Sequence, residues 1–332
     1  MKFLIAGLGS IGRRHLRNLR ALGEEDILLY RTGRATLPDD ELAGLPVETD
    51  LRAALDHKPD AVIVSNPTAL HLDVAIPAAE AGCAILLEKP VSHSLERVDA
   101  LAAAAARSGS PILVGFQFRF HPTLQTARRL LAEGALGRIL VARLHFGEYL
   151  PAWHPWEDYR RGYAARADLG GGVVLTQCHS LDYLPWLVGP VDSLWAFAGS
   201  LGDLGVEVDD TAEIGLRFAG GAFGSIHLNM VQQPPAHRWE IIGTEGTLTW
   251  DNATGLLRRY LPAAKAWEDY PAPPEFERNV MFLEEMRHFL AVARRQVQPL
   301  CTLEDGLAAL RLALAALQSA AEGRLVHLRG GD

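Results

Sequence analysis

The first fourteen residues, MKFLIAGLGSIGRR, join a short apolar run directly to a glycine-rich turn and then to a helical pattern. The turn has the spacing G-x-G-x-x-G, with Gly7, Gly9 and Gly12 at the glycine positions. In this context the glycines provide a tight turn, close approach of a pyrophosphate to the backbone, and close packing of helix on strand. We therefore predict a dinucleotide site in which Gly7, Gly9, Ser10, Ile11 and Gly12 hold phosphates at the helix N-terminus.

Five apolar runs alternate with helical patterns between Lys2 and about Gln117. The runs read KFLIA, DILLY, DAVIVS, AILLE and PILVGF. Alternation of this kind is typical of repeated βαβ units around a parallel sheet. We predict an α/β protein whose residues 1–120 form a Rossmann dinucleotide-binding domain.

The pattern changes after His121. TAEIGLRF and AFGSIHLNM flank a Gly220-Gly221 turn, and HRWEII and TLTWD flank a second turn, so both pairs predict hairpins. Two helical patterns close the chain, and the second opens with Thr302 and Asp305 in a capping-box spacing. We predict that residues 121–332 form a C-terminal α+β domain with a large, mostly antiparallel sheet.

Charge and composition narrow the classes of partner. The 332 residues carry a formal net charge of −8, and no basic cluster suits a nucleic acid. We interpret Arg13, Arg14, Arg17 and Arg20 as a solvated helix face. No stretch approaches the ~20 apolar residues of a membrane span.

The three cysteines also argue for a particular compartment. Cys83, Cys178 and Cys301 are far apart, in neither a disulfide pattern nor a metal-site spacing. The apolar N-terminal run is short and broken by glycines, unlike a signal peptide. We expect a cytoplasmic protein with no metal, no membrane partner and no nucleic-acid partner.

The second apolar run bears on the choice of cofactor. It ends Leu29-Tyr30-Arg31-Thr32-Gly33-Arg34, with no acid at its tip to bind the ribose hydroxyl of NAD. Arg31, with Thr32 and Arg34, is suited to a 2′-phosphate, so NADP is favoured over NAD. The alternative is that Arg31 is a solvated loop charge that stacks on adenine.

Motifs at the ends of the next two strands resemble those of a known family. The third run ends Ser65-Asn66-Pro67 with His71 close behind, and the fourth ends Glu88-Lys89-Pro90. After that glycine turn, this pair resembles the glucose-fructose oxidoreductase / inositol dehydrogenase (Gfo/Idh/MocA) family. Further stretches follow in the family's order: VGFQFRFHP, EGALGRI, the GGG run with His179 and Asp182, GTEGTL and EDGLAAL.

The resemblance implies an NAD(P)-dependent oxidoreductase acting on a hydroxyl or keto carbon of a sugar, sugar derivative or nucleotide sugar. The segment from Trp153 to Gly189 looks like a branch associated with nonulosonic or nucleotide-sugar pathways. The resemblance also implies a homodimer or homotetramer through the C-terminal sheet. Two alternatives are an NAD-retaining, redox-neutral glycoside hydrolase and a catalytically silent sugar or dinucleotide sensor.

Two residues are the candidate catalytic groups. Lys89 ends a parallel strand at its carboxyl edge, where a cation can hold and polarise a reacting oxygen. His179, with Thr176 and Asp182 three residues to either side, suits general acid/base work. Related sequences often have an aspartate where this chain has Thr176, which reduces that position to a hydrogen bond. The alternative for His179 is a core histidine bonded to Asp182, and Pro185 predicts a kink or local break in its helix.

The remaining candidates complete the two binding sets. We expect Glu88 and Asn66 around the nicotinamide ribose, and Ser65, Pro67, His71 and Gln117 elsewhere along the cofactor. The candidates for substrate binding, besides Lys89, Thr176 and His179, are Arg119, Trp156, Arg160 and Tyr163. The aromatic loop that supplies the last three is equally typical of a packing lid or an oligomer contact.

Overall fold

The computed structural model describes residues 1–33, 37–38 and 40–328, so Arg34 lies outside the described residues. The chain divides into two compact units. The first contains Met1–Gln117 and Glu277–Leu307, and the second contains Phe118–Phe276 and Ala308–Asp332. The division after Gln117 lies close to the expected boundary at 120. The return of Glu277–Leu307 to the first unit differs from the expected continuous segment 121–332.

The first unit is built on a six-stranded parallel sheet with the order β3-β2-β1-β4-β5-β6. Its strands are β1 (Phe3–Ala6), β2 (Ile27–Tyr30), β3 (Val47–Glu48), β4 (Ala61–Val64), β5 (Ala84–Glu88) and β6 (Ile112–Gly115). Its helices are α1 (Ser10–Ala21), α2 (Leu51–Asp56), α3 (His71–Glu80), α4 (Val98–Ser108) and α8 (Arg278–Ala293). This order is that of a Rossmann fold, which confirms the predicted class.

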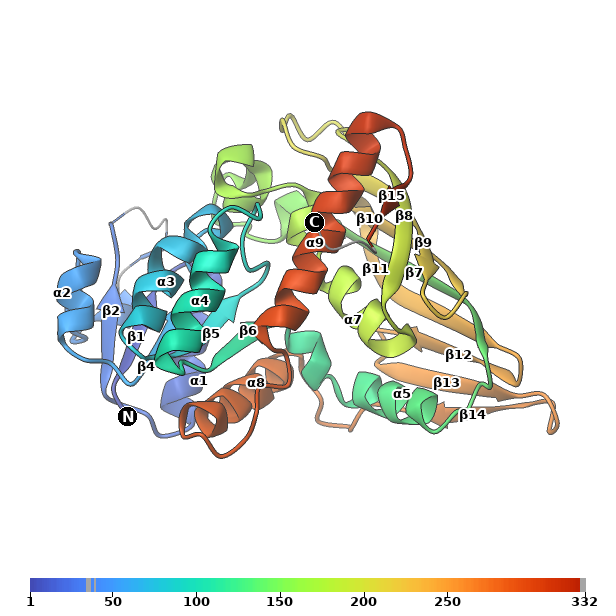
Figure 1. The fold of residues 1–332 in the computed structure, drawn as a ribbon, viewed down its shortest axis with the longest axis horizontal. Coiled ribbons are helices and arrows are strands. Elements are labelled where there is room, and N and C mark those ends of the chain that lie inside the picture. The colour runs from blue at the N-terminus through green and yellow to red at the C-terminus, as the bar shows by residue number, and fades with distance from the viewer. Residues whose placement is uncertain (34–36, 39, 329–332) are drawn as a thin grey trace. The chain divides into compact units, whose positions relative to one another are not determined.

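Helices cover both faces of this sheet (Figure 1). Helices α3 and α4 pack side by side on one face, and α1 and α8 pack side by side on the other. β1 and β4 are buried along their whole length, because helices lie above and below them. The sequence therefore shows continuous apolar runs here instead of an alternating pattern.

The second unit is built on a nine-stranded mixed sheet with the order β14-β13-β12-β11-β7-β10-β9-β8-β15. Its strands are β7 (Ile139–Tyr149), β8 (Val191–Gly199), β9 (Thr211–Phe218), β10 (Phe223–Asn229), β11 (Val231–Gly243), β12 (Gly246–Asp251), β13 (Leu256–Leu261), β14 (Ala266–Tyr270) and β15 (Val326–His327). Only β7 and β10 pair in parallel in the described sheet. The two predicted hairpins are the antiparallel pairs β9–β10 and β11–β12, which confirms a mostly antiparallel sheet.

Helices cover one face of this second sheet. They are α5 (Pro122–Ala132), α6 (Val173–Thr176), α7 (His179–Val188) and the later part of α9 (Leu303–Glu322). Side chains of β12 alternate strictly between buried and half-buried, as expected for a sheet with one covered face. The predicted capping box is present at α9, where Thr302 and Asp305 exchange hydrogen bonds of 2.8 and 3.2 Å.

Two buried histidines lie under the covered face of the second sheet. Nε2 of His237 lies 2.7 Å from the Tyr183 hydroxyl, and its ring stacks on Phe146 at a centroid distance of 3.9 Å. Nδ1 of His121 lies 3.0 Å from the Thr123 hydroxyl. Burial lowers the pKa of His121 to about 4, and burial with the nearby His121 and His145 lowers that of His237 to about 3. Both rings are therefore neutral in the folded protein.

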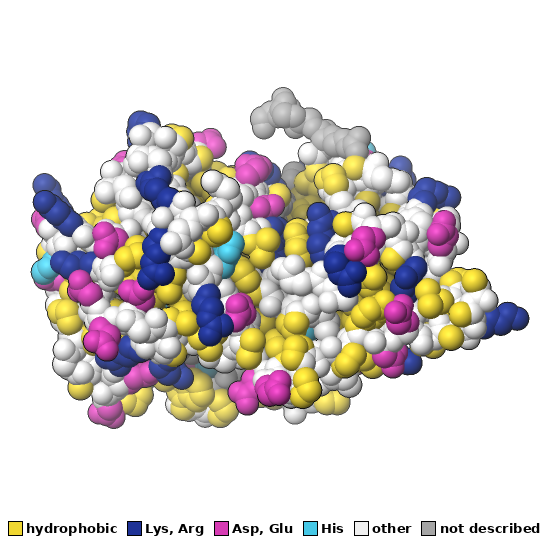
Figure 2. Space-filling model, turned by 90° about the horizontal axis from the view of Figure 1, so that it is seen from below, with side chains coloured by type: hydrophobic (Ala, Val, Ile, Leu, Met, Phe, Trp, Pro, Cys, Tyr) yellow, Lys and Arg dark blue, Asp and Glu magenta, His cyan; other side chains and the backbone are white. Residues whose placement is uncertain are grey.

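Charges of both signs are interspersed over the face drawn in Figure 2. The described residues also include exposed ion pairs such as Arg97–Asp73 and Arg258–Asp269. Within the described part of the chain, none of the helices combines the length and apolar character that a membrane crossing requires.

Candidate functional site

The glycine turn leaves open space at one position. A Cβ at Gly7, whose φ is +94°, would lie 2.4 Å from the backbone nitrogen of Asn66, and one at Gly12 would lie 2.0 Å from the Gly7 carbonyl oxygen. A Cβ at Gly9 would meet no atom within 4 Å, and no side chain caps the first turn of α1. The N–H groups of Ser10 and Ile11 in that turn suit phosphate oxygens, so this site fits a dinucleotide.

Of the predicted cofactor residues after β4, Ser65 is bonded to this turn, and His71 is bonded to the neighbouring Asn66. Ser65 Oγ donates hydrogen bonds to the carbonyls of Ala6 (3.1 Å) and Gly7 (2.9 Å). The ring nitrogens of His71 lie 3.0 Å from the Asn66 carbonyl and 2.8 Å from the Pro90 carbonyl. Burial lowers the pKa of His71, although Glu88 and both carbonyls oppose this shift. His71 thus links the segments that follow β4 and β5, and Pro67 lies between Asn66 and His71 in the first segment.

Glu88 and Lys89 lie at the carboxyl end of β5. Glu88 is buried, and its Oε1 lies 2.7 Å from Nε2 of His15. Its Oε2 accepts a 3.2 Å hydrogen bond from the backbone N–H of Lys89. Burial raises the pKa of Glu88, but His15, Lys89 and His71 outweigh it and bring that pKa below its usual value. A charged carboxylate therefore lies beside the half-buried Lys89.

The tip of β2 holds the residues expected to select the cofactor. The N–H of Arg31 donates to the Glu48 carbonyl at 3.1 Å, and Thr32 is exposed. Arg13, interpreted from sequence as solvated, is only 3% exposed and donates to carbonyls of Leu37 and Pro38. That interpretation is wrong for Arg13, because its guanidinium binds the loop after β2.

His179 begins α7 in the second unit. It is 8% exposed, and its ring meets the edge of Phe118 at a centroid distance of 5.2 Å. The expected helix around it is divided, since α6 ends at Thr176 and α7 begins at His179. In contrast to the expected local break, α7 continues past Pro185 to Val188.

Arg119 and Asp182 form a buried ion pair in the second unit. The Arg119 guanidinium donates through Nε and Nη2 to the carboxylate, with the shortest distance 2.7 Å. Asp182 is 4% exposed and Arg119 also 4%. The Arg119 guanidinium lies 5.6 Å from the Trp186 ring. Asp182 therefore pairs with Arg119, and a bond between Asp182 and His179 stays a prediction.

The aromatic loop contains the short 3-10 turns η4 (Leu150–Ala152), η5 (Tyr159–Arg161) and η6 (Tyr163–Ala165), with Arg160 on η5 and Tyr163 at the start of η6. Trp156, between the first two, is 59% exposed. The Arg160 guanidinium lies 4.6 Å from the Tyr159 ring, and the Tyr159 hydroxyl donates to the Leu204 carbonyl at 2.8 Å. The loop is thus fixed to residues near 204 while Trp156 remains accessible.

Asp209 is a contact that the sequence did not reveal. Its carboxylate accepts a 2.9 Å hydrogen bond from the N–H of Val174, and its carbonyl accepts one from Val173. A Cβ at Gly172 would lie 2.2 Å from its Oδ1. Burial raises the pKa of Asp209. Asp209 therefore fixes the start of α6, the helix that carries Thr176, and the GGG run permits this approach.

Gln117 is 3% exposed and begins the 3-10 turn η3 (Gln117–Phe120) at the end of the first unit. Direct contacts thus join Ser65 to Gly7, His71 to Asn66 and Glu88 to Lys89, and Arg119, Thr176 and His179 all belong to the second unit. His15 and Glu285 were missed. The sequence held a signal for His15, because this residue shares a helical face with Gly12, Leu16 and Leu19.

Two family models match the chain. The oxidoreductase family with an NAD-binding Rossmann fold matches residues 1–116, and the GFO/IDH/MocA C-terminal domain matches residues 124–249. The first match covers most of the unit with the parallel sheet, and the second lies within the unit with the mixed sheet.

Similar whole proteins are also found. The uncharacterized oxidoreductase YrbE of Bacillus subtilis is 30% identical, covering 98% of this chain and 95% of that protein. The myo-inositol 2-dehydrogenase of Thermotoga maritima is 27% identical, covering 99% and 98%. A structure of levoglucosan dehydrogenase in complex with NADH superposes with a TM-score of 0.87 over 100% of both chains at 22% identity, a likeness of fold.

Proposed function

Because the chain belongs to the GFO/IDH/MocA family of oxidoreductases, we propose that it transfers a hydride between a nicotinamide and a hydroxyl or keto carbon of a sugar, sugar derivative or nucleotide sugar. The observation that carries this proposal is the end of β5, where Lys89 follows the buried, charged Glu88. The named relatives are dehydrogenases and oxidoreductases, so neither the hydrolase nor the sensor alternative is favoured.

Lys89 is assigned to the reacting oxygen of the substrate. When bound, the nicotinamide supplies the hydride acceptor or donor. The ammonium of Lys89, kept charged by the adjacent Glu88 carboxylate, holds the hydroxyl and stabilises negative charge as its proton leaves. The rest of the cofactor is assigned to the glycine turn, Ser65, Asn66, Pro67, His71, Glu88 and Gln117.

His179 is assigned to proton transfer in the same reaction. In oxidation it accepts the hydroxyl proton, and in reduction it returns that proton. Thr176 cannot ionise, so the role assigned to it is a hydrogen bond from its hydroxyl to the substrate. Trp156, Tyr163 and Arg160 are assigned to the sugar ring and any anionic group it carries, and Arg119 supports this region through Asp182.

The proposed activity is tested with a panel of sugars, polyols and sugar nucleotides. Reduction of NAD or NADP by at least one compound, followed by absorbance of the reduced nicotinamide, is the expected result. Turnover of a glycoside without added nucleotide would contradict it in favour of the hydrolase.

For the cofactor we propose NADP over NAD, with Arg31 and Thr32 at the 2′-phosphate. Fluorescence titration should give roughly tenfold tighter binding of NADPH than of NADH, about the value of one added charge-assisted contact. Arg31→Ala should remove most of this preference and leave NADH binding nearly unchanged. Equal or weaker binding of NADPH by the unaltered protein would sink the proposal. We propose a cytoplasmic location, which the burial of all three cysteines supports.

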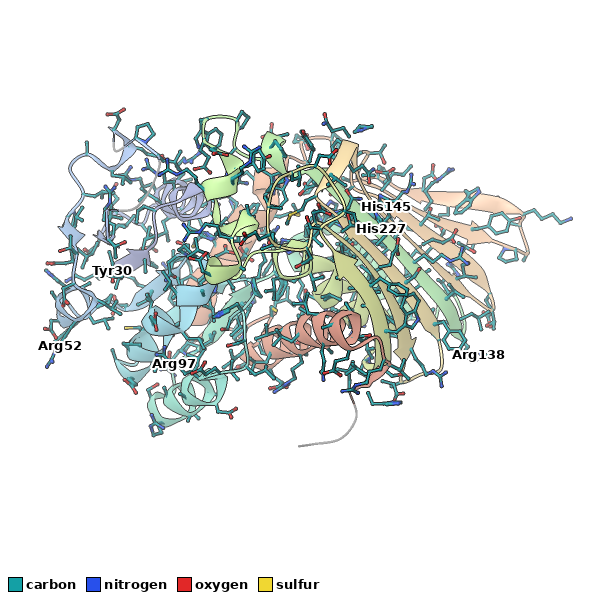
Figure 3. All side chains as sticks on the ribbon, turned by 90° about the horizontal axis from the view of Figure 1, so that it is seen from above. Tyr30, Arg52, Arg97, Arg138, His145 and His227 are labelled. Carbon is teal, nitrogen blue, oxygen red and sulfur yellow. The ribbon has the colours of Figure 1, made fainter. Side chains whose placement is uncertain are left out.

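We also propose that copies of the chain associate through the uncovered face of the second sheet. A cavity of about 590 Å³ lies on this face, lined by Arg143, His145, His227, Arg238 and neighbours. Figure 3 labels His145 and His227, whose rings stack at 4.6 Å. Trp195 and Phe197 are 45% and 70% exposed on β8. Such apolar side chains on an open sheet face mark an interaction surface.

Phe197→Asp should shift the protein from a dimer or tetramer toward a smaller species in analytical ultracentrifugation, since a buried unpaired charge opposes association. The dissociation constant should rise by roughly tenfold or more. Arg52→Glu, an exposed change in the first unit, is the control. An unchanged mass for Phe197→Asp would place the interface elsewhere.

A further inference from the structure

Three buried ionisable side chains converge on the end of β5 in the first unit. His15 on α1 and Glu285 on α8 are both 0% exposed, and Glu88 at the end of β5 is 6% exposed. Helix α8 packs against both α1 and β5. A Cβ on Gly115 of β6 would lie 3.3 Å from the Glu88 carboxylate, so this glycine gives the carboxylate its space.

The three groups are not equivalent in charge. Glu88 is bonded to His15 through Oε1 at 2.7 Å and to the Lys89 backbone through Oε2. Neither carboxyl oxygen of Glu285 has a hydrogen-bond partner among the described residues. Burial and the charge of Glu88 raise the pKa of Glu285 well above its usual value. Burial without a hydrogen-bond partner therefore favours the neutral form of Glu285, and the bonds to Glu88 favour its charged form.

Other charged groups face Glu88 from the elements around it. They are His71 on α3, Lys89 itself and, from α1, Arg14. The Arg14 guanidinium lies over the Phe282 ring, 4.5 Å from its centroid. Among the described side chains around Glu88, the His15 ring lies within hydrogen-bond distance of its carboxylate, at 2.7 Å.

We propose that His15 and Glu285 are positioning residues for Lys89: His15 holds the Glu88 carboxylate charged at the strand end, and Glu285 confines that charge to Glu88. This inference rests on the proposed function of Lys89. Without the His15 ring, Glu88 would keep the Lys89 N–H but lose its side-chain partner, which favours protonation of the buried carboxylate, and Lys89 would then lose its adjacent counter-charge. His15 acts on the reaction only through Glu88.

An arrangement with only a structural role would be more stable if these side chains were apolar, since burying an ion pair costs as much as it returns. The orphaned Glu285 carboxyl adds a further cost. These groups lie around the end of β5, next to the candidate catalytic lysine, and we attribute the free-energy cost of burying them to a role at that lysine.

The first test compares His15→Leu, which removes the donor, with His15→Gln, which retains one. In His15→Leu the pKa of Glu88 should rise, so the acid limb of the pH profile of kcat/KM should move upward by about one to two pH units. His15→Gln should show a smaller shift, and KM should change by less than about twofold in both.

The chain offers a matched control. His57 and Glu48 form a second histidine–glutamate pair in the same unit, with Nε2 and Oε1 2.9 Å apart, but His57 is exposed. His57→Gln should leave the pH profile unchanged. An unshifted acid limb in both His15 variants, with the wild type active, would overturn the role of His15.

The second test does not depend on activity. The infrared spectrum at neutral pH should contain the carbonyl stretch of a protonated carboxylic acid, and Glu285→Gln should remove it. Absence of that band from the wild type, or its persistence in Glu285→Gln, would overturn the assignment of Glu285. If no compound in the panel is oxidised or reduced, the proposed function fails, while the infrared result still decides the charge of Glu285.

Discussion

Replacing Lys89 with methionine should lower kcat/KM by roughly 10²- to 10⁴-fold, the range for removal of a group that stabilises charge and assists proton transfer. Methionine keeps the length of the side chain and removes its charge. The measurement is substrate-dependent reduction of the nicotinamide cofactor. Sugar-dependent reduction at the wild-type rate would show that the role assigned to Lys89 is wrong.

Two further variants make this result specific. Lys58→Met changes an exposed lysine of the same unit and should leave activity unchanged. His179→Asn should lower kcat by roughly 10²-fold, as expected for loss of a general base. Binding of the reduced cofactor, followed by fluorescence, should survive in His179→Asn because His179 lies in the second unit.

The second large effect concerns stability in acid. His121 and His237 are neutral in the folded protein, with pKa values lowered to about 4 and about 3. The unfolded chain takes up these protons near the ordinary histidine pKa of about 6.5. Their contribution to stability is therefore complete above about pH 6.5 and is lost as the pH falls toward 4 and 3. Between pH 7 and pH 5 each should lower the free energy of unfolding by about 2 kcal/mol, as an upper limit.

Urea unfolding at the two pH values tests this prediction. The double variant His237→Phe with Tyr183→Phe removes the titrating ring together with the hydroxyl bonded to it, so neither partner is left unsatisfied. Its loss of stability from pH 7 to pH 5 should be about 2 kcal/mol smaller than that of the wild type. His57→Gln is the exposed control. An identical loss in the double variant would show that His237 is not a source of acid sensitivity.

The parts of the fold that sequence predicts well are those with local signals. The apolar runs mark the buried parallel strands, and the alternation at β9 and β12 marks a sheet with one covered face. β3 was missed because it contains only Val47 and Glu48, too few residues to show the alternation of apolar and polar side chains that marks a strand. The break between α6 and α7 was missed because Gln177 and Cys178 carry no helix-breaking signal, whereas Pro185 does.

The site was predictable where residues follow strands. Ser65, Glu88 and Lys89 come directly after or at the ends of β4 and β5, and the topology places such ends together. Arg119 could not be assigned from sequence, because its pairing with Asp182 joins positions that are far apart in the chain. Glu285 was hidden for the same reason: nothing in a helix near the C-terminus indicates that it lies against β5.

The segment Glu277–Leu307 belongs to the first unit but comes late in the chain, so the first unit cannot be completed early in synthesis. Helix α8 packs on α1, β5 and β6, although it is synthesised after nearly the whole second unit. Until the ribosome has passed residue 307, the face of the parallel sheet beside α1 lacks part of its cover, and Glu88 lacks its neighbour Glu285. A fragment ending near residue 117 would expose that apolar face, so exchange of the cofactor unit between relatives must transfer both segments together.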